Sequence, residues 1–311
     1  MPVVPRPLFT PPGRSVARPR RRLLRALVAA PVGLLAGCAT ATPRTSTSAG
    51  DPAQRLQAAL ATQPLVLLGE VHDNAAQHRL RADALARWLA SGARPALLME
   101  QFDRERQAAL DAAMAAPGGN AEARADAVIE AGWPQGRAGW DWTFYRPFIT
   151  LALQHRLPLV AANVSRTDTR RIVSGGLAAA GFEPAVPADI AQAQAGAIVA
   201  SHCGQVDEPL ARQLMLAQVA RDQFMARQLV AHAATGAVLL AGNGHVRRDI
   251  GVPRWLPPEW QRRSMAIGLL EEGEAPDAAF DLALFTPAAA RGDPCAGMAR
   301  IPQRPAPGTA R

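Results

Sequence analysis

Two stretches of the 311-residue chain end in a histidine and carry side chains suited to acid–base or metal chemistry. Residues 64–73 read PLVLLGEVHD and place Glu70 and His72 after an apolar run, and residues 237–245 read AVLLAGNGH and end at His245. In each stretch a glycine closes a run of strand length, and the histidine stands three residues later. Ligands bind outside the carboxyl ends of the strands in an open parallel sheet. The pattern therefore predicts that the two histidines share one crevice.

Polar residues also follow two other apolar runs. Glu100 follows the run at 96–99, and Asn163 and Arg166 close the run that begins at Pro158. Histidines and carboxylates at one sheet edge could bind a divalent metal such as Mn, Co or Zn and activate water, or could serve as acid and base. The candidate metal ligands are Glu70, His72, Glu100 and His245. The sequence has no HExxH, GxSxG or GxxxxGK[ST] pattern, which argues against a zincin helix, a serine nucleophile and a P-loop.

The apolar runs alternate with helical patterns and predict an α/β fold, with a parallel sheet flanked by helices. Four strands are expected, at Leu65–Gly69, Ala96–Met99, Pro158–Val164 and Val238–Ala241. Amphipathic patterns between them predict helices at 52–62, 74–91, 104–115 and 144–155.

Three further segments predict helical structure outside this alternation. Residues 121–142 contain short helical patterns and are expected to be an insertion that packs over the sheet edge. Residues 167–207 contain no clear strand pattern and predict a smaller helical subdomain. The longest helical pattern follows at 209–233.

The end of the chain predicts two closing strands and a tail. Residues 265–270 and 280–285 have strand patterns and are expected to form an antiparallel edge. The domain is therefore expected over residues 51–286, with helical insertions. Residues 287–311 are rich in Pro, Ala, Gly and Arg and predict a disordered tail, except where Cys295 is tied down.

The distribution of charge argues against a nucleic-acid partner. The formal net charge is +8, but residues 1–37 contain seven arginines and no acidic residue. Removing those seven charges from the total of +8 leaves +1 for the rest of the chain. Nucleic-acid-binding domains carry a basic patch or a basic helix. We expect no nucleic acid among the partners.

The basic segment, residues 1–37, is similar to a bacterial lipoprotein signal peptide. Arginines at 18–25 precede an apolar run at 26–36, which suits a signal-peptide core and is too short to span a bilayer. The run closes on Leu-Ala-Gly-Cys, which matches the lipobox, and Cys38 is expected to be acylated. The alternative is a plain secretory signal with an incidental cysteine. Residues 38–50 are rich in Thr, Ser, Ala and Pro and predict a flexible tether.

The expected location is the cell envelope, with the lipid anchor in a membrane. Ala39 follows Cys38, and an alanine rather than an aspartate at this position favours the outer membrane in Gram-negative lipoproteins. The two remaining cysteines, Cys203 and Cys295, would then lie in an oxidising compartment and are candidates for a disulfide bond. A zinc site is not indicated, because the cysteine at 203 has no second cysteine or histidine pair.

Six segments of the chain are similar to motifs of one known family. They are GEVH at 69–72, LLMEQF at 97–102, WTFYRPF at 142–148, AANVSR at 161–166, RDQFMA at 221–226 and GNGH at 242–245. In this order they resemble the ChaN family of haem-binding bacterial lipoproteins implicated in iron uptake. Its superfamily also contains Tiki metalloproteases, TraB-like proteins and erythromycin esterases. The resemblance implies a parallel sheet, a smaller helical part, homodimers that enclose a pair of haems, and an outer-membrane haem or iron receptor as partner.

The resemblance also implies a ligand for the haem iron. In the family's haem-binding member a tyrosine holds the iron, with a histidine and basic groups nearby. This chain has one tyrosine, Tyr145, which lies in the WTFYRPF segment. A phenolate is a hard oxygen donor that suits ferric haem, and Arg146 beside it would pair with a propionate or lower the pKa of the phenol. The other interpretation is a tyrosine that anchors the start of a helix. The remaining candidate haem-binding residues are His72, His245, Asn163 and Arg166.

Three functional hypotheses follow, of which the last is an adhesion or scaffold lipoprotein that binds no ligand. The first is a lipid-anchored protein of haem or iron acquisition that binds ferric haem through Tyr145. The alternative is a metal-dependent hydrolase that uses both GxxH segments, because the Tiki and esterase branches keep those histidines and the strand-end glutamates in their working site. The segments around Tyr145 and Asn163 favour the haem binder.

Overall fold

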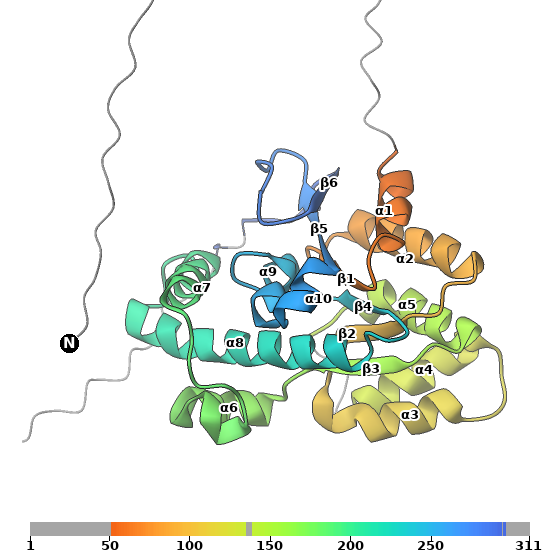
Figure 1. Cartoon of the computed structure of the whole chain (residues 1–311), viewed down its shortest axis with the longest axis horizontal. Coiled ribbons are helices and arrows are strands. Elements are labelled where there is room, and N and C mark those ends of the chain that lie inside the picture. Colours follow the sequence, from red (N-terminus) through yellow and green to blue (C-terminus); the bar gives the residue numbers. More distant parts are fainter. Residues whose placement is uncertain (1–50, 135–138, 294, 297–311) are drawn as a thin grey trace, which may run out of the picture. The chain divides into compact units, whose positions relative to one another are not determined.

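The computed structural model of the chain describes residues 51–134, 139–293 and 295–296, all within a unit that spans residues 47–311. This part contains a six-stranded sheet in which each pair of neighbours runs parallel (Figure 1). Across the sheet the strands are β3 (Leu159–Asn163), β2 (Ala96–Asp103), β4 (Ala237–Leu240), β1 (Leu65–Leu68), β5 (Ser264–Glu271) and β6 (Leu282–Thr286). The predicted α/β fold is confirmed.

Helices cover both faces of the sheet, which explains why the central strands are apolar at consecutive positions. Val66 and Leu68 of β1 pack into one core, whose other members come largely from α1 (Pro52–Leu60), α2 (Ala75–Ala90), α3 (Gln107–Ala115), α4 (Ala121–Gly132) and α5 (Trp142–His155). Leu65 and Leu67 face the opposite way and pack with the second half of α8 (Glu208–Ala231). Alternate residues of β1 thus pack against helices on opposite faces of the sheet.

A third core belongs to the helical subdomain that the sequence predicted. Its members come from α6 (Arg166–Gly175), η2 (Leu177–Ala180), α7 (Ala188–Ser201) and the first half of α8. Figure 1 shows α6 and α7 flanking one end of α8. Because α8 belongs to the second and third cores, it fixes the subdomain to the sheet.

Two expectations about the strands need correction. The closing strands are not an antiparallel edge: β5 pairs in parallel with both β1 and β6. The apolar pattern of a strand does not encode its direction. The connection at 272–281 is long enough to return the chain to the edge of the sheet at which β5 begins, so that β6 runs parallel to β5. The second strand also continues past Met99 to Asp103, with a shift in its register against β3. Glu100 therefore lies within β2 and not in a loop after it.

The helix start after the first motif is set by a cap. The side chain of Asn74 accepts a hydrogen bond from the backbone N–H of Gln77, which satisfies one of the free donors of α2. Short helical segments elsewhere are η1 (Arg104–Arg106), α9 (Asn243–Val246), η3 (Val252–Trp255) and α10 (Pro258–Arg262). The α9 helix carries the second motif directly after β4.

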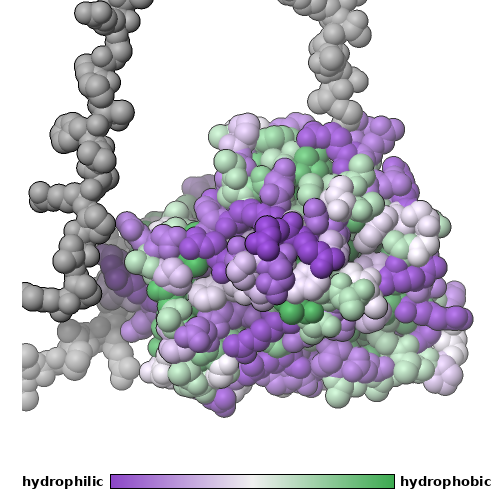
Figure 2. Space-filling view, viewed as in Figure 1, coloured by the Kyte–Doolittle hydropathy of each residue, from purple (hydrophilic) through white to green (hydrophobic). Residues whose placement is uncertain are grey.

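The predicted signal peptide, Cys38 and the tether lie outside the described residues, as does most of the predicted tail. Among the residues that are described, none of the helices is sufficiently long and apolar for a membrane span. On the face shown in Figure 2, hydrophilic side chains predominate and hydrophobic ones occur in small separate patches. Such a mixture is usual for a protein surface in contact with water.

Candidate functional site

The two glycine–histidine motifs interlock at the carboxyl edge of the sheet. β1 and β4 are neighbours in register, with Leu68 opposite Leu240, so the motifs that follow them meet. A Cβ at Gly242 would lie 2.8 Å from Cε1 and 2.9 Å from Nε2 of His72. A Cβ at Gly69 would overlap the side-chain oxygen of Asn243. Each motif's first glycine therefore leaves the space that a side chain of the other motif occupies.

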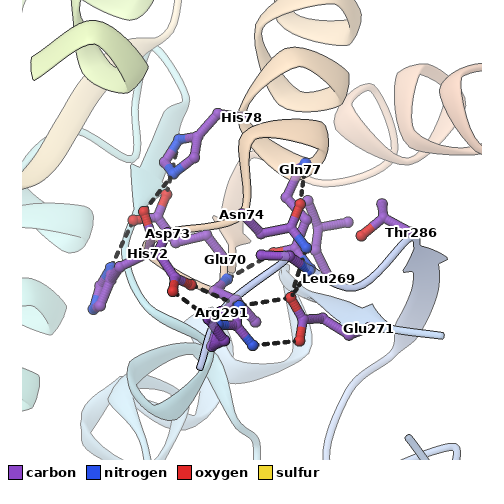
Figure 3. Close-up of polar contacts among 12 residues, drawn as sticks. Glu70, His72, Asp73, Asn74, Gln77, His78, Leu269, Glu271, Thr286 and Arg291 are labelled. Atoms are coloured by element: carbon purple, nitrogen blue, oxygen red, sulfur yellow. Dashed lines mark hydrogen bonds and ion pairs between the residues drawn. The ribbon is translucent and has the colours of Figure 1, made fainter. Parts of the chain in front are cut away.

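Glu70 is the centre of what we call the β1 corner, which also contains His72, Tyr145 and Arg81. The glutamate is 2% exposed, and its Oε1 accepts hydrogen bonds from Tyr145 Oη at 2.6 Å and from His72 Nδ1 at 2.8 Å. Its Oε2 forms an ion pair with the buried guanidinium of Arg81 on α2. The side chain of His72 is 49% exposed, and Figure 3 shows it beside Glu70. In this corner the carboxylate of Glu70 is therefore buried and the imidazole of His72 is exposed.

Tyr145 is part of the core under this corner. It is 1% exposed, and the rings of His78, Trp140 and Trp142 contact it edge-on, with centroids 4.9, 5.4 and 6.2 Å away. Burial raises the pKa of Tyr145, and the positive charge of Arg81 offsets only part of this. The hydroxyl is therefore a proton donor to Glu70 at neutral pH. This arrangement matches the helix-anchoring interpretation.

Glu100, Asp222 and His245 form a second group, the β4 corner. Nδ1 of His245 lies 2.6 Å from Oδ1 of Asp222 on α8, and Nε2 lies 3.5 Å from Oε1 of Glu100. The other carboxylate oxygens are also bound: the Gly242 N–H donates to Glu100 at 2.8 Å, and Gln194 on α7 donates to Asp222 at 2.9 Å. The His245 side chain is only 12% exposed. The imidazole is held between two carboxylates.

The β4 corner favours a protonated histidine. Burial lowers the pKa of His245, but the charges of Glu100 and Asp222 outweigh it and the pKa lies above the ordinary value. Burial raises the pKa of Asp222, and the bonds from His245 and Gln194 offset this only in part. Burial would also raise the pKa of Glu100, yet the two histidines and the Gly242 N–H bring it below its usual value. The corner can therefore store a proton and pass it to or from a bound group.

Both corners open into one cavity of about 870 Å³, a size within the range of small-molecule sites. His72, Asp222 and His245 contribute polar groups from the strand ends and α8, while Ile198 of α7 and Phe280 contribute apolar ones. Glu70, His72 and His245 thus line one cavity after the strand ends, whereas Glu100 contacts His245 from within β2 and is not among the lining residues. Within the described residues, however, no group of three or more His, Cys, Asp or Glu side chains is arranged to hold a metal ion.

Arg146 does not lie beside the Tyr145 hydroxyl. Its guanidinium hydrogen-bonds to Glu122 and Asp126 of α4, at 2.7 and 3.2 Å, next to a separate cavity between α2, α4 and α5. Successive helical residues point about 100° apart, so neighbours in sequence face different surroundings. The expectation that Arg146 lowers the pKa of the phenol is wrong, because that pKa is raised and the nearby cation is Arg81.

Asn163 and Arg166 lie at the end of β3, outside the set of residues that line the large cavity. Asn163 accepts a hydrogen bond from Arg221 at 3.1 Å. Arg166 is exposed at the first position of α6. Both neighbour Asp103, whose pKa is raised to about 6 by burial and by Glu105, against the charges of nearby arginines.

Sequence reasoning missed Arg81 and Asp222, which complete the two corners. Each is a charged residue on the buried face of a helix: Leu85 and Leu89 follow Arg81 on α2, and Met225 and Leu229 follow Asp222 on α8. A charge on an apolar stripe at helical spacing is a signal for a buried partner, because charged residues are almost never fully buried unless paired. That signal could have been read from the sequence, but not the identity of the partner.

The segment that we call the C-terminal strap, residues 287–293, borders the β1 corner. Arg291 donates to both carboxylate oxygens of Asp73, at 2.8 and 2.7 Å, and to both of Glu271, at 2.7 Å each (Figure 3). These bonds lower the pKa of Glu271 to about 2. Beyond the strap, Cys295 is joined by a disulfide to Cys203 after α7, with the Cα atoms 5.7 Å apart. Ordered contacts therefore continue into the segment expected to be a disordered tail.

The family comparison agrees with this architecture. The model of the family described as "Haem-binding uptake, Tiki superfamily, ChaN" matches residues 56–256, which include both corners. The chain belongs to the ChaN family. No curated protein matches its sequence.

One solved structure supports the fold. The structure of ChaN of Campylobacter jejuni with cofacial heme has a TM-score of 0.60 and 20% sequence identity, covering 74% of this chain and 90% of that one. A weaker likeness is the type III effector HopBA1, with a TM-score of 0.45 and 18% identity, covering 78% of this chain and 95% of that one. Another is a mutant of the erythromycin esterase EreC, with a TM-score of 0.39 and 14% identity, covering 73% of this chain and 76% of that one. The expected resemblance to ChaN is confirmed.

Proposed function

We propose that this protein binds haem in the cavity at the carboxyl edge of the sheet and serves haem or iron uptake. Membership of a haem-binding uptake family supports the cofactor. The observation that carries the proposal is the half-exposed imidazole of His72, which lines a cavity of about 870 Å³ together with apolar groups. Among the described residues Nε2 of His72 has no hydrogen-bond partner. A free imidazole nitrogen is a common axial ligand of haem iron.

The two candidate donors fit this role differently. His72 lines the cavity, and its Nε2 has no hydrogen-bond partner among the described residues. Tyr145, the ligand that the resemblance implies, would first have to leave Glu70, open the ring contacts above it and lose its proton against a raised pKa. When bound, ferric haem would supply a Lewis-acidic iron, and the residues of the β1 corner would supply its donor.

Hemin titration of the purified protein tests the proposal. We expect a saturable shift of the Soret band, with one hemin bound per chain. The control variant His155→Ala should bind hemin like the wild type, because His155 lies at the far end of α5 and not in the cavity lining. A spectrum that equals free hemin plus protein at every ratio would contradict haem binding.

The envelope location is part of the same proposal. We propose that Cys38 is acylated and holds the protein at the outer membrane, where a haem or iron receptor exchanges cargo with it. Cys38→Ser should move the protein from the membrane fraction to the soluble one and abolish labelling by a fatty-acid analogue. Membrane fractionation that does not change would contradict the anchor.

A homodimer that encloses a pair of haems is proposed from the family resemblance. Light scattering coupled to size exclusion, with and without hemin, measures the mass of the complex. We expect the mass to double in the presence of hemin. A monomer that binds hemin stoichiometrically would exclude the shared arrangement.

A second candidate function is hydrolysis, and the pairing of each histidine with a carboxylate favours it. His72 with Glu70 and His245 with Asp222 present one imidazole each to the same cavity. Such pairs act as general acid and base. The metal-dependent form with Mn, Co or Zn predicts bound metal in elemental analysis, lost in a His72→Ala, His245→Ala variant. The metal-free form predicts ester hydrolysis that persists in a chelator and is lost in His245→Ala.

A further inference from the structure

We propose that the disulfide between Cys203 and Cys295 is a redox-sensitive switch that controls access to the large cavity. While the bond is intact, the C-terminal strap holds α7 as one wall of the cavity, and reduction by a dithiol releases that wall. The inference goes beyond haem binding and does not depend on which ligand occupies the cavity. The strap lies outside residues 56–256, the part of the chain that the family model matches.

The strap is fixed beside the β1 corner before the chain reaches the disulfide. Arg291 lies between Asp73 and Glu271 and donates hydrogen bonds to both carboxylates (Figure 3). The side chain of Asn74 donates to the carbonyl oxygen of Pro287 at 2.9 Å. These contacts attach the strap to the segment between the first motif and α2.

The disulfide extends this attachment to α7. Cys295 stands four positions after Arg291, so the chain reaches at most about 14 Å beyond the ion pairs of the strap, even when it is extended. Cys203 stands two positions after the last residue of α7, and the Cα atoms of the two cysteines are 5.7 Å apart. The end of α7 therefore cannot move far from the β1 corner while the bond is intact.

The backbone at Cys203 indicates that a cysteine is needed there. The residue that follows the C-cap of a helix is commonly a glycine in the left-handed conformation. Cys203 follows the C-cap of α7 and has a φ of 54°. A side chain is less favourable than glycine in this conformation, and the disulfide offsets that cost. We expect the end of α7 to fray when the bond is broken.

α7 is a wall of the cavity that is only shallowly buried. Gln194, Ile198 and Ser201 line the cavity, but only four of the 14 residues of the helix are buried. Segments with few buried apolar contacts open at a low cost in free energy. Because Gln194 donates to Asp222 at 2.9 Å, movement of α7 also uncovers the β4 corner, where Asp222 contacts His245.

The reduction is a thiol–disulfide exchange. A thiolate of the dithiol attacks one sulfur of the bond and forms a mixed disulfide, and the second thiol then displaces the remaining cysteine. Two electrons and two protons pass to the protein, which gains two thiols, and the dithiol becomes a cyclic disulfide. Cys295 is exposed and Cys203 is partly exposed, so a dithiol in solution can reach the bond.

Hydrogen exchange of the purified protein, oxidised or treated with dithiothreitol, is the first test. At short labelling times, before global unfolding contributes, we expect the amides of α7 to exchange about tenfold faster in the reduced protein. Those of α2 should keep their rates. The Cys203→Ser, Cys295→Ser variant should match the reduced wild type and should not respond to dithiothreitol. Unchanged exchange in α7, or equal acceleration in α2 and α7, would overturn the proposal.

The second test measures access to the cavity with diethyl pyrocarbonate, which acylates neutral imidazoles. His245 has a side chain that is 12% exposed, whereas that of His72 is 49% exposed. At one pH, we expect reduction to raise the rate of modification of His245 several-fold and to leave that of His72 unchanged. Mass spectrometry of the peptides reads each site. An unchanged rate at His245 would overturn control of access.

Arg291→Met tests the part of the strap, because it removes the ion pairs with Asp73 and Glu271 and keeps the disulfide. The oxidised variant should resemble the reduced wild type in both measurements. The matched control is Arg262→Met, an exposed arginine outside the strap and the cavity lining. An oxidised Arg291→Met variant that behaves like the oxidised wild type would overturn the role of the strap.

Discussion

The two corners of the site carry the same glycine–histidine motif but differ in the exposure of the histidine and in the groups that contact it. In the β1 corner the histidine side chain is 49% exposed and its carboxylate is buried against a tyrosine and an arginine. In the β4 corner the histidine side chain is 12% exposed and lies between two carboxylates. Both histidines stand three residues after a glycine that closes a parallel strand. The motif sets the position of the ring, and the neighbouring helix sets its chemistry.

The difference gives the two histidines different electrostatic surroundings. α5 brings a neutral hydroxyl to Glu70, and α2 brings Arg81, so the β1 corner is close to charge balance. Nε2 of His72 has no hydrogen-bond partner among the described residues. α8 brings Asp222 to His245, so the β4 corner has one more carboxylate than its histidine can match. A free nitrogen suits a ligand for a Lewis acid, whereas an excess of negative charge suits a residue that holds a proton.

The largest expected effect comes from removing the cation of the β1 corner. Arg81→Met leaves the buried Glu70 without its ion-pair partner, and we expect the free energy of unfolding to fall by about 3–5 kcal/mol. Denaturation by guanidinium chloride measures it. The matched control is Arg79→Met, an exposed arginine on the same helix. Equal losses in the two variants would mean that the pair does not hold the corner.

The second effect concerns the link between the corners. The disulfide closes a loop with a sequence separation of 92 residues and ties the region beyond the strap to the end of α7, which carries the Gln194 that binds Asp222. A Cys203→Ser, Cys295→Ser variant should lose about 2–4 kcal/mol of stability. The wild type treated with a thiol reductant should behave in the same way. A variant as stable as the oxidised wild type would show that the link is dispensable.

The third prediction uses pH to separate His78, which lies under the β1 corner, from His245 of the β4 corner. Burial lowers the pKa of His78, which stacks on Phe144 under the β1 corner, from 6.5 to about 4. The unfolded chain therefore binds more protons between these pH values, and stability falls as pH drops through this window, by at most about 3 kcal/mol. His78→Phe should remove this part of the acid dependence.

The β4 corner should show the opposite sign. The pKa of His245 is raised in the folded state, so its contribution to stability is complete below pH 6.5 and is lost as pH rises through the folded pKa. The difference in unfolding free energy between the wild type and His245→Asn should shrink on the alkaline side. Urea denaturation from pH 4 to 9 measures both limbs, and parallel curves for the wild type and both variants would remove the distinction.

The smallest expected effect tests the contact between the motifs. Gly242→Ala places a methyl group against His72 and should cost about 1–3 kcal/mol as overpacking, together with weaker hemin binding. The control is Gly244→Ala in the same motif, where no atom lies within 4 Å of an added Cβ. If both variants bind hemin like the wild type, the glycine does not seat the ring.

Much of the framework follows from the sequence. The first four strands, the helical subdomain and the longest helix were predictable because periodicity reports burial, and burial on both faces identifies a parallel sheet. The direction of β5 and β6 was not predictable, because an apolar strand pattern reads the same for either direction. The side of α5 that holds Arg146 was misjudged for a related reason: adjacency in sequence is not adjacency on a helix.

The sequence by itself determined that Glu70, His72, Glu100 and His245 meet at one edge, because parallel strands bring their carboxyl ends together. Only the tertiary structure decided what each of them does. Arg81, Tyr145 and Asp222 reach the site from α2, α5 and α8, and each pairs with a residue outside its own helix. Burial and ion pairing depend on those contacts, since the imidazole of His72 lies beside one carboxylate and that of His245 lies between two. The local sequence determines where the strands end, whereas tertiary packing sets the protonation states.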